Sequence, residues 1–430
     1  MMRKLLWFTL GFGLAVLLGA YLLPPDLYFY GSGAFALMLA LCLVLMFRFP
    51  KARIGAMVAF GCTIGLLWYT VFDANYLSVA RGYEGETVEL TLMAQDYSYA
   101  TDYGAATECA VELDGKRFLV WTYHDPEISL SPGDTICAAF LFQSTLPGGD
   151  SASDYNRSHG IFLTARSMGE VRLQKAEAVP WYLRPAKWRR ILTDRLQEIF
   201  PRDTAGFARA LLLGDTEGID YLTDTAFKRS GIRHVIAVSG LHVSILFSLV
   251  YVFTGRRKWF TALLGFPSLL AFAALTGFSP SITRACIMHG LTIMAILVDR
   301  EYDPPSALSF AVLVMLIANP WTATHVGFQL SVGCVAGIFL FSSGIQNWLL
   351  DSARLGRYRG FRGRIARFFA VSVSISLAAG ILTTPLSAMY FGMVSLLNVL
   401  TNLLTLWVVS FVFCGILLVL LLSWIIWPLA

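Results

Sequence analysis

The chain has 430 residues, of which 56% are hydrophobic and only 14% are charged, and its mean hydropathy is +0.63. Soluble globular proteins have roughly 45 to 50% apolar and about 25% charged residues, so this composition excludes an ordinary soluble domain. The 33 basic and 28 acidic residues leave a net charge of +5. We therefore predict an α-helical membrane protein that crosses the bilayer several times.

Ten apolar runs are predicted to be membrane spans, since a helix that crosses a bilayer needs about 17 to 25 apolar residues. They cover residues 5–23, 33–47, 54–72, 235–254, 260–278, 282–298, 307–321, 326–341, 370–390 and 396–427. The first three make residues 1–72 an N-terminal set of transmembrane helices. The first run also resembles a secretory signal peptide, but two further spans follow it directly, which favours a retained anchor.

The distribution of Lys and Arg between the runs predicts the orientation of the chain. If the spans alternate, the basic residues at 3–4, 48–53, 256–258 and 354–367 all fall on one side. Membrane proteins carry an excess of positive charge on the cytoplasmic side. We therefore expect a multi-pass protein of the cytoplasmic (inner) membrane with its N-terminus in the cytoplasm.

Residues 73–180 have the composition of a soluble β domain, and the alternation of spans makes this domain extracytoplasmic. Short strands are predicted at residues 86–94 and 135–143, and residues 110–122 form a hairpin that turns at Asp114 and Gly115. Strands this short favour a small OB-like β-barrel. Cys109 and Cys137 lie on predicted strands on the oxidising side, so we expect a disulfide between them; two buried free thiols are the alternative.

The charge of the β domain does not by itself favour binding to nucleic acid. Its acidic residues outnumber its basic ones, whereas a general phosphate-binding surface is basic. Aromatic residues such as Tyr99, Trp121 and Tyr123 have the chemistry to stack on bases. Packing in the core and at the rim of a barrel explains them equally well.

Residues 181–202 are predicted to form a basic amphipathic helix at the membrane interface, because apolar side chains recur there at helical spacing. Its cations Arg184, Lys187, Arg189 and Arg190 also suit a basic collar at the entry of a pathway for a polyanion. Residues 203–430 follow as a transmembrane channel domain. That domain begins with two short helices, at 204–213 and 221–229.

Polar residues inside the later spans point to function, because such groups are costly in a membrane. Ser239 and His242 are three residues apart and are predicted to share a helix face, and Gly240 is a candidate helix break. Arg284 lies one turn into a helix that starts at Ser279 and Pro280. Its side chain is therefore close to the positive end of that helix, and the two together suit the binding of an anion. The alternative for Arg284 is that its side chain reaches the outer headgroups.

Two further spans carry polar side chains. Gln329 lies early in one span, and Asn398 and Asn402 form a polar stripe in the last one. Each group alone is explained by hydrogen bonding between helices. Several polar spans in one bundle nevertheless favour a wet internal pathway.

Several enzyme classes find little support. The sequence has no Gly-x-x-x-x-Gly-Lys motif for nucleotide hydrolysis, and its six histidines are too scattered for a metal motif, so neither a metal nor a cofactor is expected. Residues 237–240 differ by one residue from a Gly-x-Ser-Gly nucleophile motif. An intramembrane serine protease that uses Ser239 with His289 therefore stays as an alternative.

Four ordered motifs resemble those of the ComEC-type competence proteins, the DNA-uptake channels of bacterial natural transformation. They are Leu-Leu-Leu-Gly-Asp at 211–215, the stretch Gly231 to Val243, the stretch Gly277 to Ala285, and Gly-Phe-Gln-Leu-Ser at 327–331. The resemblance is strong from residue 203 to the end of the chain. Before that point the resemblance rests on the arrangement of three spans and an exported OB-like domain.

The resemblance implies a channel that conducts single-stranded DNA across the cytoplasmic membrane during natural transformation, and not an enzyme. Many members carry a C-terminal metallo-β-lactamase-like domain proposed to degrade the other strand, but this sequence lacks a His-x-His-x-Asp-His cluster. We expect either a truncated chain or a member that leaves degradation to a separate nuclease. The expected partners are single-stranded DNA, membrane lipids, an outer DNA receptor, and a cytoplasmic ATP-driven translocase with single-strand-binding proteins.

A pathway for a DNA strand needs groups that replace the lost hydration of phosphates without holding them tightly. We expect the following residues along it: Asp215, Arg229, Arg233, His234, Ser239, His242, Arg284, Gln329, Asn398 and Asn402. A transporter of a small anionic or lipid substrate is the second alternative.

Overall fold

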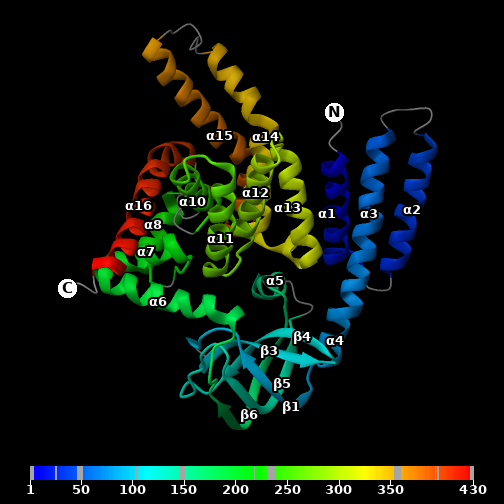
Figure 1. The fold of residues 1–430 in the computed structure, drawn as a ribbon. Helices are drawn as coiled ribbons and strands as arrows, with labels where there is room; N and C mark the ends of the chain where they lie inside the picture. The colour runs from blue at the N-terminus through cyan, green and yellow to red at the C-terminus, as the bar shows by residue number, and fades with distance from the viewer. Residues whose placement is uncertain are drawn as a thin grey trace. The chain divides into compact units, whose positions relative to one another are not determined.

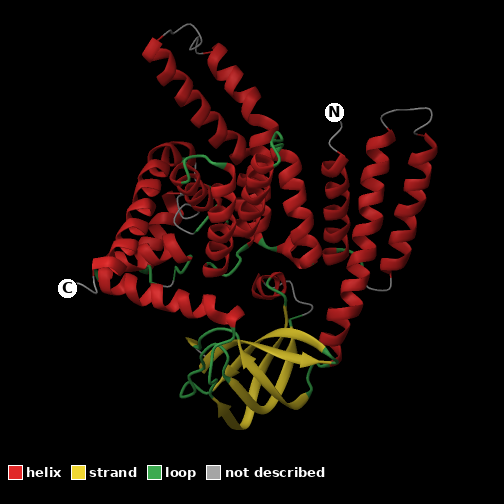
Figure 2. Cartoon of the chain, in the orientation of Figure 1, coloured by secondary structure: helices red, strands yellow, loops and turns green. Residues whose placement is uncertain are grey.

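The protein is described by a computed structural model that covers residues 4–24, 27–45, 52–101, 104–145, 151–216, 218–230, 238–352, 360–392, 394 and 397–426. The chain forms two compact units. Unit 1 contains residues 1–188 and 309–325, and unit 2 contains residues 189–308 and 326–430. The strands of the described residues, yellow in Figure 2, all fall within residues 87–174 and so belong to unit 1. The predicted four-part division into domains stays a prediction.

Unit 1 begins with three apolar helices: α1 (Lys4–Tyr21), α2 (Tyr28–Leu45) and α3 (Ala52–Phe72). Helix α3 packs against both of the others, and the three lie side by side in Figure 1. A π-helix (Asp73–Leu77) and the short α4 (Ser78–Gly82) continue α3 toward the β domain. The apolar runs predicted for this region therefore form helices.

The β domain is a five-stranded barrel with one short additional strand. The strands are β1 (Thr87–Ala94), β2 (Tyr99–Thr101), β3 (Gly104–Leu113), β4 (Lys116–His124), β5 (Thr135–Ser144) and β6 (Ile161–Gln174). They follow the order β1-β5-β6-β4-β3, a β1–β3 pairing closes the barrel, and β2 extends β3. Strands β4 and β6 are parallel. This small barrel confirms the predicted β-barrel fold.

The predicted hairpin is confirmed at Asp114 and Gly115. Strands β3 and β4 pair from Ala105 with His124 to Leu113 with Lys116, which leaves two residues for the turn. Both have positive φ, 49° at Asp114 and 71° at Gly115. That is the conformation a two-residue hairpin requires, and an Asp-Gly pair adopts it readily.

The predicted disulfide between Cys109 and Cys137 is wrong, because both thiols are free. Cys109 on β3 pairs with Ala94 of β1, and Cys137 on β5 pairs with Thr91 of the same strand. Strand β1 therefore lies between the two strands that carry the thiols, which are about 9.6 Å apart at the usual strand spacing. A disulfide needs Cα atoms within roughly 7 Å. Residues 91 and 94 also lie on opposite faces of β1. Burial raises the pKa of the Cys109 thiol to about 12.

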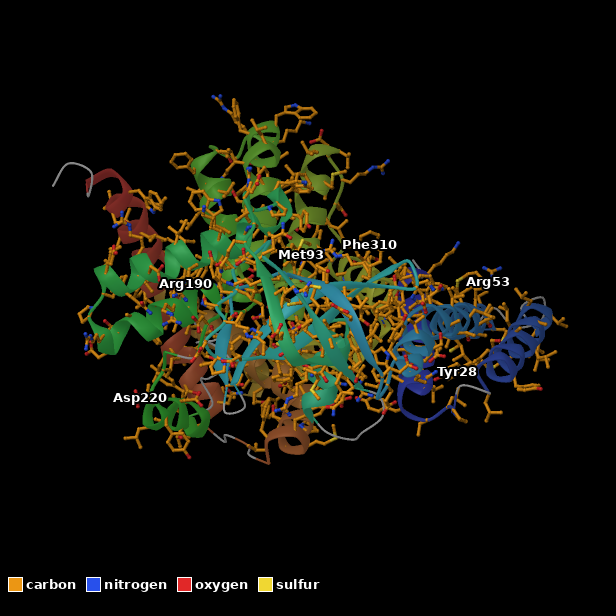
Figure 3. The ribbon with its side chains drawn as sticks, turned by 90° about the horizontal axis from the view of Figure 1, so that it is seen from below. Tyr28, Arg53, Met93, Arg190, Asp220 and Phe310 are labelled. Atoms are coloured by element: carbon orange, nitrogen blue, oxygen red, sulfur yellow. The ribbon has the colours of Figure 1, made fainter. Side chains whose placement is uncertain are left out.

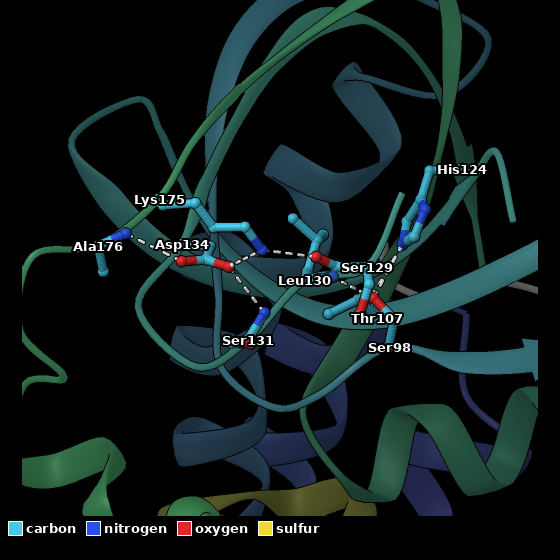
Figure 4. Close-up of polar contacts among 9 residues, drawn as sticks. All are labelled: Ser98, Thr107, His124, Ser129, Leu130, Ser131, Asp134, Lys175 and Ala176. Carbon is cyan, nitrogen blue, oxygen red and sulfur yellow. Dashed lines mark hydrogen bonds and ion pairs between the residues drawn. The ribbon is translucent and has the colours of Figure 1, made fainter. Parts of the chain in front are cut away.

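The loop between β4 and β5 is held by a buried carboxylate, Asp134 (Figure 4). It accepts hydrogen bonds from the backbone amides of Ser131 and Ala176 and from Lys175 Nζ, each at 2.9 Å. A second set of contacts joins the same loop to the barrel, since Ser98 Oγ accepts from the Leu130 amide at 2.9 Å. Asp134 is only 3% exposed, so these contacts are shielded from water.

The contribution of Asp134 should depend on pH. Burial acts to raise its pKa, but the hydrogen bonds from Ala176, Lys175 and Ser131 outweigh it, and the pKa lies below its ordinary value. A carboxylate whose pKa is lowered in the folded state stabilises the fold at pH values above its unfolded-state pKa of about 3.9. This stabilisation is lost as the pH falls through the folded-state pKa. We expect Asp134→Asn to destabilise the β domain by about 2 kcal/mol at pH 7.

Below pH 4 the difference between Asp134→Asn and the wild type should shrink, because a protonated Asp134 resembles asparagine. Hydrogen exchange of residues 87–174 in the purified full chain, followed by mass spectrometry and by thermal unfolding at each pH, measures both effects. A constant difference from pH 7 to pH 3 would show that the charge of Asp134 does not matter.

Helix α5 (Ser151–Ser158) packs on a short 3-10 helix, η4 (Pro320–Thr324), within unit 1. The Arg157 guanidinium lies 4.4 Å from the centre of the Trp321 ring, a cation–π distance. Asn319 Nδ2 donates to the carbonyl oxygen of Arg157 at 2.9 Å. The β domain is thereby fixed to residues 309–325 through side chains and not through strand pairing.

Unit 2 consists of helices. They are α6 (Arg184–Ile199, which starts in unit 1), α7 (Arg202–Leu213), α8 (Tyr221–Ser230), α10 (Gly240–Phe253), α11 (Lys258–Leu275), α12 (Pro280–Leu297), α14 (Val326–Ser352), α15 (Gly360–Phe391) and α16 (Asn398–Ile426). Helix α13 (Pro304–Ala318) is divided between the units. Buried apolar side chains of α7, α10, α11, α12 and α16 form one core, which includes Leu211, Val243, Phe272 and Phe413.

Within the described ranges, seven helices are long and apolar enough to cross a membrane. They are α1, α3 with its extension, α11, α12, α14, α15 and α16; apolar helices in residues 30–45, 240–253 and 304–318 are shorter. The last predicted run is one continuous helix, α16. The orientation of the chain and the side on which the β domain lies stay predictions.

Candidate functional site

Helix α10 begins at Gly240, inside the run predicted to span the membrane from residue 235. Ser239 is the residue before the helix, and its backbone N–H donates to His242 Nδ1 at 3.0 Å as part of a capping box. The prediction that Ser239 and His242 share a helix face is therefore wrong, because Ser239 has extended backbone geometry. Their contact is a helix cap.

Helix α10 is too short to cross a bilayer. Its 14 residues rise about 21 Å, against roughly 30 Å for the hydrocarbon core. An interrupted span is tolerated only where protein or water satisfies the backbone groups at the break. The start of α10 is therefore a polar position within a largely apolar unit.

Arg284 is buried next to this helix start. It is 8% exposed, and its Nε donates to Ser331 Oγ of α14 at 2.8 Å. A side-chain carbon added at Gly240 would lie 3.2 Å from Arg284 Nη2, so α10 approaches the guanidinium closely. Among the described residues no carboxylate lies within ion-pair distance of Arg284. The alternative in which Arg284 extends to the headgroups does not fit a buried guanidinium.

Three helix N-termini meet around Arg284. Gly240 is the first residue of α10 and contacts the second turn of α12. Ser281, the second residue of α12, has its Oγ 3.1 Å from Ser331 Oγ in the second turn of α14. Ser279 precedes α12 as predicted, although its side chain makes no capping hydrogen bond. Helix N-termini carry partial positive charge, so they add to the field of the guanidinium.

The contacts of Ser244 and His289 do not support the protease alternative. His289 Nε2 lies 2.9 Å from Ser244 Oγ, whereas Ser239 contacts His242. The Ser244 hydroxyl also lies 2.9 Å from the carbonyl oxygen of Gly240, so the hydroxyl that contacts His289 is that of Ser244 and not that of Ser239. His289 is thus not positioned as a base for Ser239.

Four buried side-chain atoms of unit 2 have no hydrogen-bond partner among the described residues. They are His242 Nε2, His289 Nδ1, Asn398 Oδ1 and Asn402 Oδ1. Leaving a buried polar atom without a partner costs about 1 to 3 kcal/mol. The partner such atoms require is water or a polar group of a substrate, which indicates a polar interior in this part of the bundle.

Two other predicted pathway residues, Asp215 and Gln329, each form a hydrogen bond with a side chain of the protein. Asp215 accepts from Arg209 Nε at 3.0 Å in a pair that holds the turn after α7. Gln329 Oε1 accepts from the hydroxyl of Tyr390 on α15 at 2.8 Å. Arg233 and His234 lie outside the described residues, and so does the side chain of Arg229.

The predicted collar residues Arg184, Lys187, Arg189 and Arg190 all lie on α6. Arg190, labelled in Figure 3, has its Nε 3.5 Å from Asp194 Oδ1 one turn later. The helix is present as predicted, and apolar residues such as Leu196 of the same helix are buried. The role of the cations as an entry collar stays a prediction.

Sequence reasoning missed the residues that hold the predicted ones in place. Ser281, Ser331 and Tyr390 contact Arg284 or Gln329, or each other, across helix interfaces. Ser281 and Ser331 belonged to motifs singled out in the sequence, but helical spacing does not reveal which side chain of another helix lies opposite. Within the described residues, the site brings together Gly240, Arg284 and the two serines.

The fold and the site define a class: a multi-pass α-helical membrane protein with an inserted small β-barrel and a buried polar site among helix N-termini. Residues 211–430, just over half of the chain, match the family model described as "Competence protein". The chain belongs to this competence protein family.

Curated relatives support the assignment. The chain is 33% identical over 153 residues to ComE operon protein 3 of Bacillus subtilis, and this aligned region covers 34% of this chain and 20% of the relative. It is 24% identical over 396 residues to Recombination protein 2 of Haemophilus influenzae, 87% of this chain and 48% of the relative. The chain thus spans less than half the length of either relative. No solved structure matches it.

Proposed function

We propose that this protein takes part in DNA uptake during natural transformation and that unit 2 conducts a single strand of DNA across the cytoplasmic membrane. The family supports the general role, and the matched residues 211–430 contain the polar site around Gly240 and Arg284. The β domain would lie outside the membrane. Conduction and not catalysis would be the activity of this chain.

The observation that carries the proposal is the buried cation Arg284. A charged side chain in the membrane costs several kcal/mol unless it is paired, and among the described residues Arg284 has no carboxylate partner. Three helix N-termini add positive potential at the same place. Such a site is complementary to an anion, and the phosphate groups of a DNA strand supply one anion per nucleotide.

The polar atoms near α10 and α16 support a hydrated route and not a single closed anion site. His242, His289, Asn398 and Asn402 each present an unpaired buried atom, and none of them is a permanent cation. Neutral polar groups replace lost hydration without binding phosphate tightly, which suits conduction. A transporter for one small anion would instead enclose its substrate with a fixed set of partners.

The other expected parts of the system belong to the same proposal. An outer DNA receptor, a cytoplasmic ATP-driven translocase, single-strand-binding proteins and a separate nuclease would complete the uptake route. Membrane lipids would contact the exposed apolar faces and the basic helix α6. Trp188 on this helix and Trp181 just before it are exposed in the manner of interfacial anchors.

Deletion of the chromosomal copy tests the proposal directly. We expect transformation and entry of labelled DNA into the cytoplasm to fall below detection, while DNA still binds to the cell surface. A plasmid copy of the full chain should restore entry. Normal transformation in the deletion strain would refute the proposed function, and loss of proteolysis of a membrane substrate after Ser239→Ala alone would favour the protease alternative.

A further inference from the structure

We propose that Ser331, with Ser281 behind it, is the positioning residue of Arg284, and that the guanidinium thereby presents its terminal edge to one phosphodiester group. The proposal rests on the proposed function and specifies the ligand chemistry of the same site. Both serines lie in motifs singled out in the sequence, but neither was predicted to line the DNA pathway.

The contacts fix the guanidinium from its Nε side. Arg284 Nε donates to Ser331 Oγ at 2.8 Å, and Ser281 Oγ lies 3.1 Å from Ser331 Oγ. An arginine side chain has many rotamers, and a hydrogen bond at Nε determines the plane of the guanidinium as well as its position. Because Ser281 is on α12 and Ser331 on α14, the pair also joins the two helices at the site.

The terminal edge, formed by Nη1 and Nη2, is left for a ligand. Nη1 lies 3.6 Å from the sulfur of Met288, which is a weak acceptor. Nη2 faces Gly240, where an added side-chain carbon would lie 3.2 Å from this nitrogen. Any larger residue at position 240 would therefore occupy the place of a ligand oxygen. Among the described residues neither Nη atom has an oxygen partner.

The shape of this edge matches a phosphodiester. Two parallel N–H groups bind two oxygens of a phosphate or carboxylate in a bidentate manner, and a phosphodiester has two non-bridging oxygens and one negative charge. A single guanidinium therefore balances the charge of one nucleotide. A lysine at position 284 would be a point charge without this geometry and would not need an Nε partner.

A double-mutant cycle separates positioning from general structure. The purified full chain in detergent is titrated against a fluorescent oligothymidylate as wild type, Ser331→Ala, Arg284→Lys and the double variant. We expect Ser331→Ala to raise Kd about tenfold when residue 284 is arginine, the loss typical of one charge-assisted contact. In the Arg284→Lys background the same change should alter Kd less than about twofold.

Two further measurements complete the test. Ser331→Thr keeps the hydroxyl and should bind within about twofold of the wild type. The logarithm of the association constant falls linearly with the logarithm of the salt concentration, and the magnitude of this slope should decrease by about 0.7 in Arg284→Gln. It should stay unchanged in Ser331→Ala, because only Arg284→Gln removes a charge. An equal loss from Ser331→Ala in both backgrounds would overturn the positioning role. Wild-type affinity in Arg284→Gln would instead refute the phosphate site of the proposed function.

Discussion

Replacing Arg284 with glutamine is expected to reduce entry of labelled DNA into the cytoplasm about 100-fold or more, with the amount of protein in the membrane unchanged. The substitution keeps the length and polarity of the side chain but removes its charge. Charge-assisted hydrogen bonds contribute about 1.5 to 3 kcal/mol each, and a bidentate contact comprises two of them. Loss of that contact accounts for an effect of this size.

The same substitution should not destabilise the protein. Arg284 is buried and has no carboxylate partner among the described residues, so removing the charge removes an unfavourable desolvation term. We expect the melting temperature of the purified Arg284→Gln variant to equal or exceed that of the wild type. A site that costs stability and is needed for activity is the pattern expected of a functional group.

A matched control lies just beyond the other end of the same helix. Arg300 follows α12 and is exposed, so Arg300→Gln removes the same charge away from the site and should leave uptake within about twofold of the wild type. Normal uptake by Arg284→Gln, at equal protein level, would exclude Arg284 from the DNA pathway.

The second large effect is expected at the contact between α1 and α3. A side-chain carbon at Gly61 would lie 2.1 Å from the carbonyl oxygen of Phe8, and one at Gly11 would lie 2.1 Å from that of Val58. Helices in a membrane associate through close packing of small residues. We expect Gly61→Val to destabilise the protein by about 3 kcal/mol, because backbone atoms cannot move aside as a flexible side chain can.

Gly33→Val is the matched control for this prediction. Gly33 lies on α2, also in an apolar helix, but no atom lies within 4 Å of the position of an added carbon. The amount of protein in the membrane and its melting temperature in detergent measure both variants. Equal behaviour of Gly61→Val and Gly33→Val would show that α1 and α3 are not in close contact.

Features with a local cause could be predicted from the sequence. The turn at Asp114 and Gly115 follows from the ease with which this pair adopts positive φ. The start of α12 follows from Pro280, whose missing N–H and restricted φ suit the first turn. Such features depend on a few neighbouring residues, so they form regardless of how the rest of the chain packs.

Features that depend on partners from distant segments could not be predicted. Cys109 and Cys137 both lie on strands, as expected. Strands β3 and β5 pair with the two opposite edges of β1, however, and this separates the cysteines. Ser239 and His242 have helical spacing, but the helix begins between them. Strand register and helix ends are determined by the energy of the whole packed unit.

The sequence by itself determined that this is a membrane protein with a small inserted β-barrel, because composition and hydrophobic periodicity report directly on transfer from water to a bilayer or core. It also indicated that Arg284 sits one turn into a helix. Only the tertiary structure decided that Ser331, 47 residues away, contacts its Nε and that Gly240 of another helix lies against its Nη2. Periodicity specifies which face of a helix is polar, whereas the partner of that face depends on how separate helices pack.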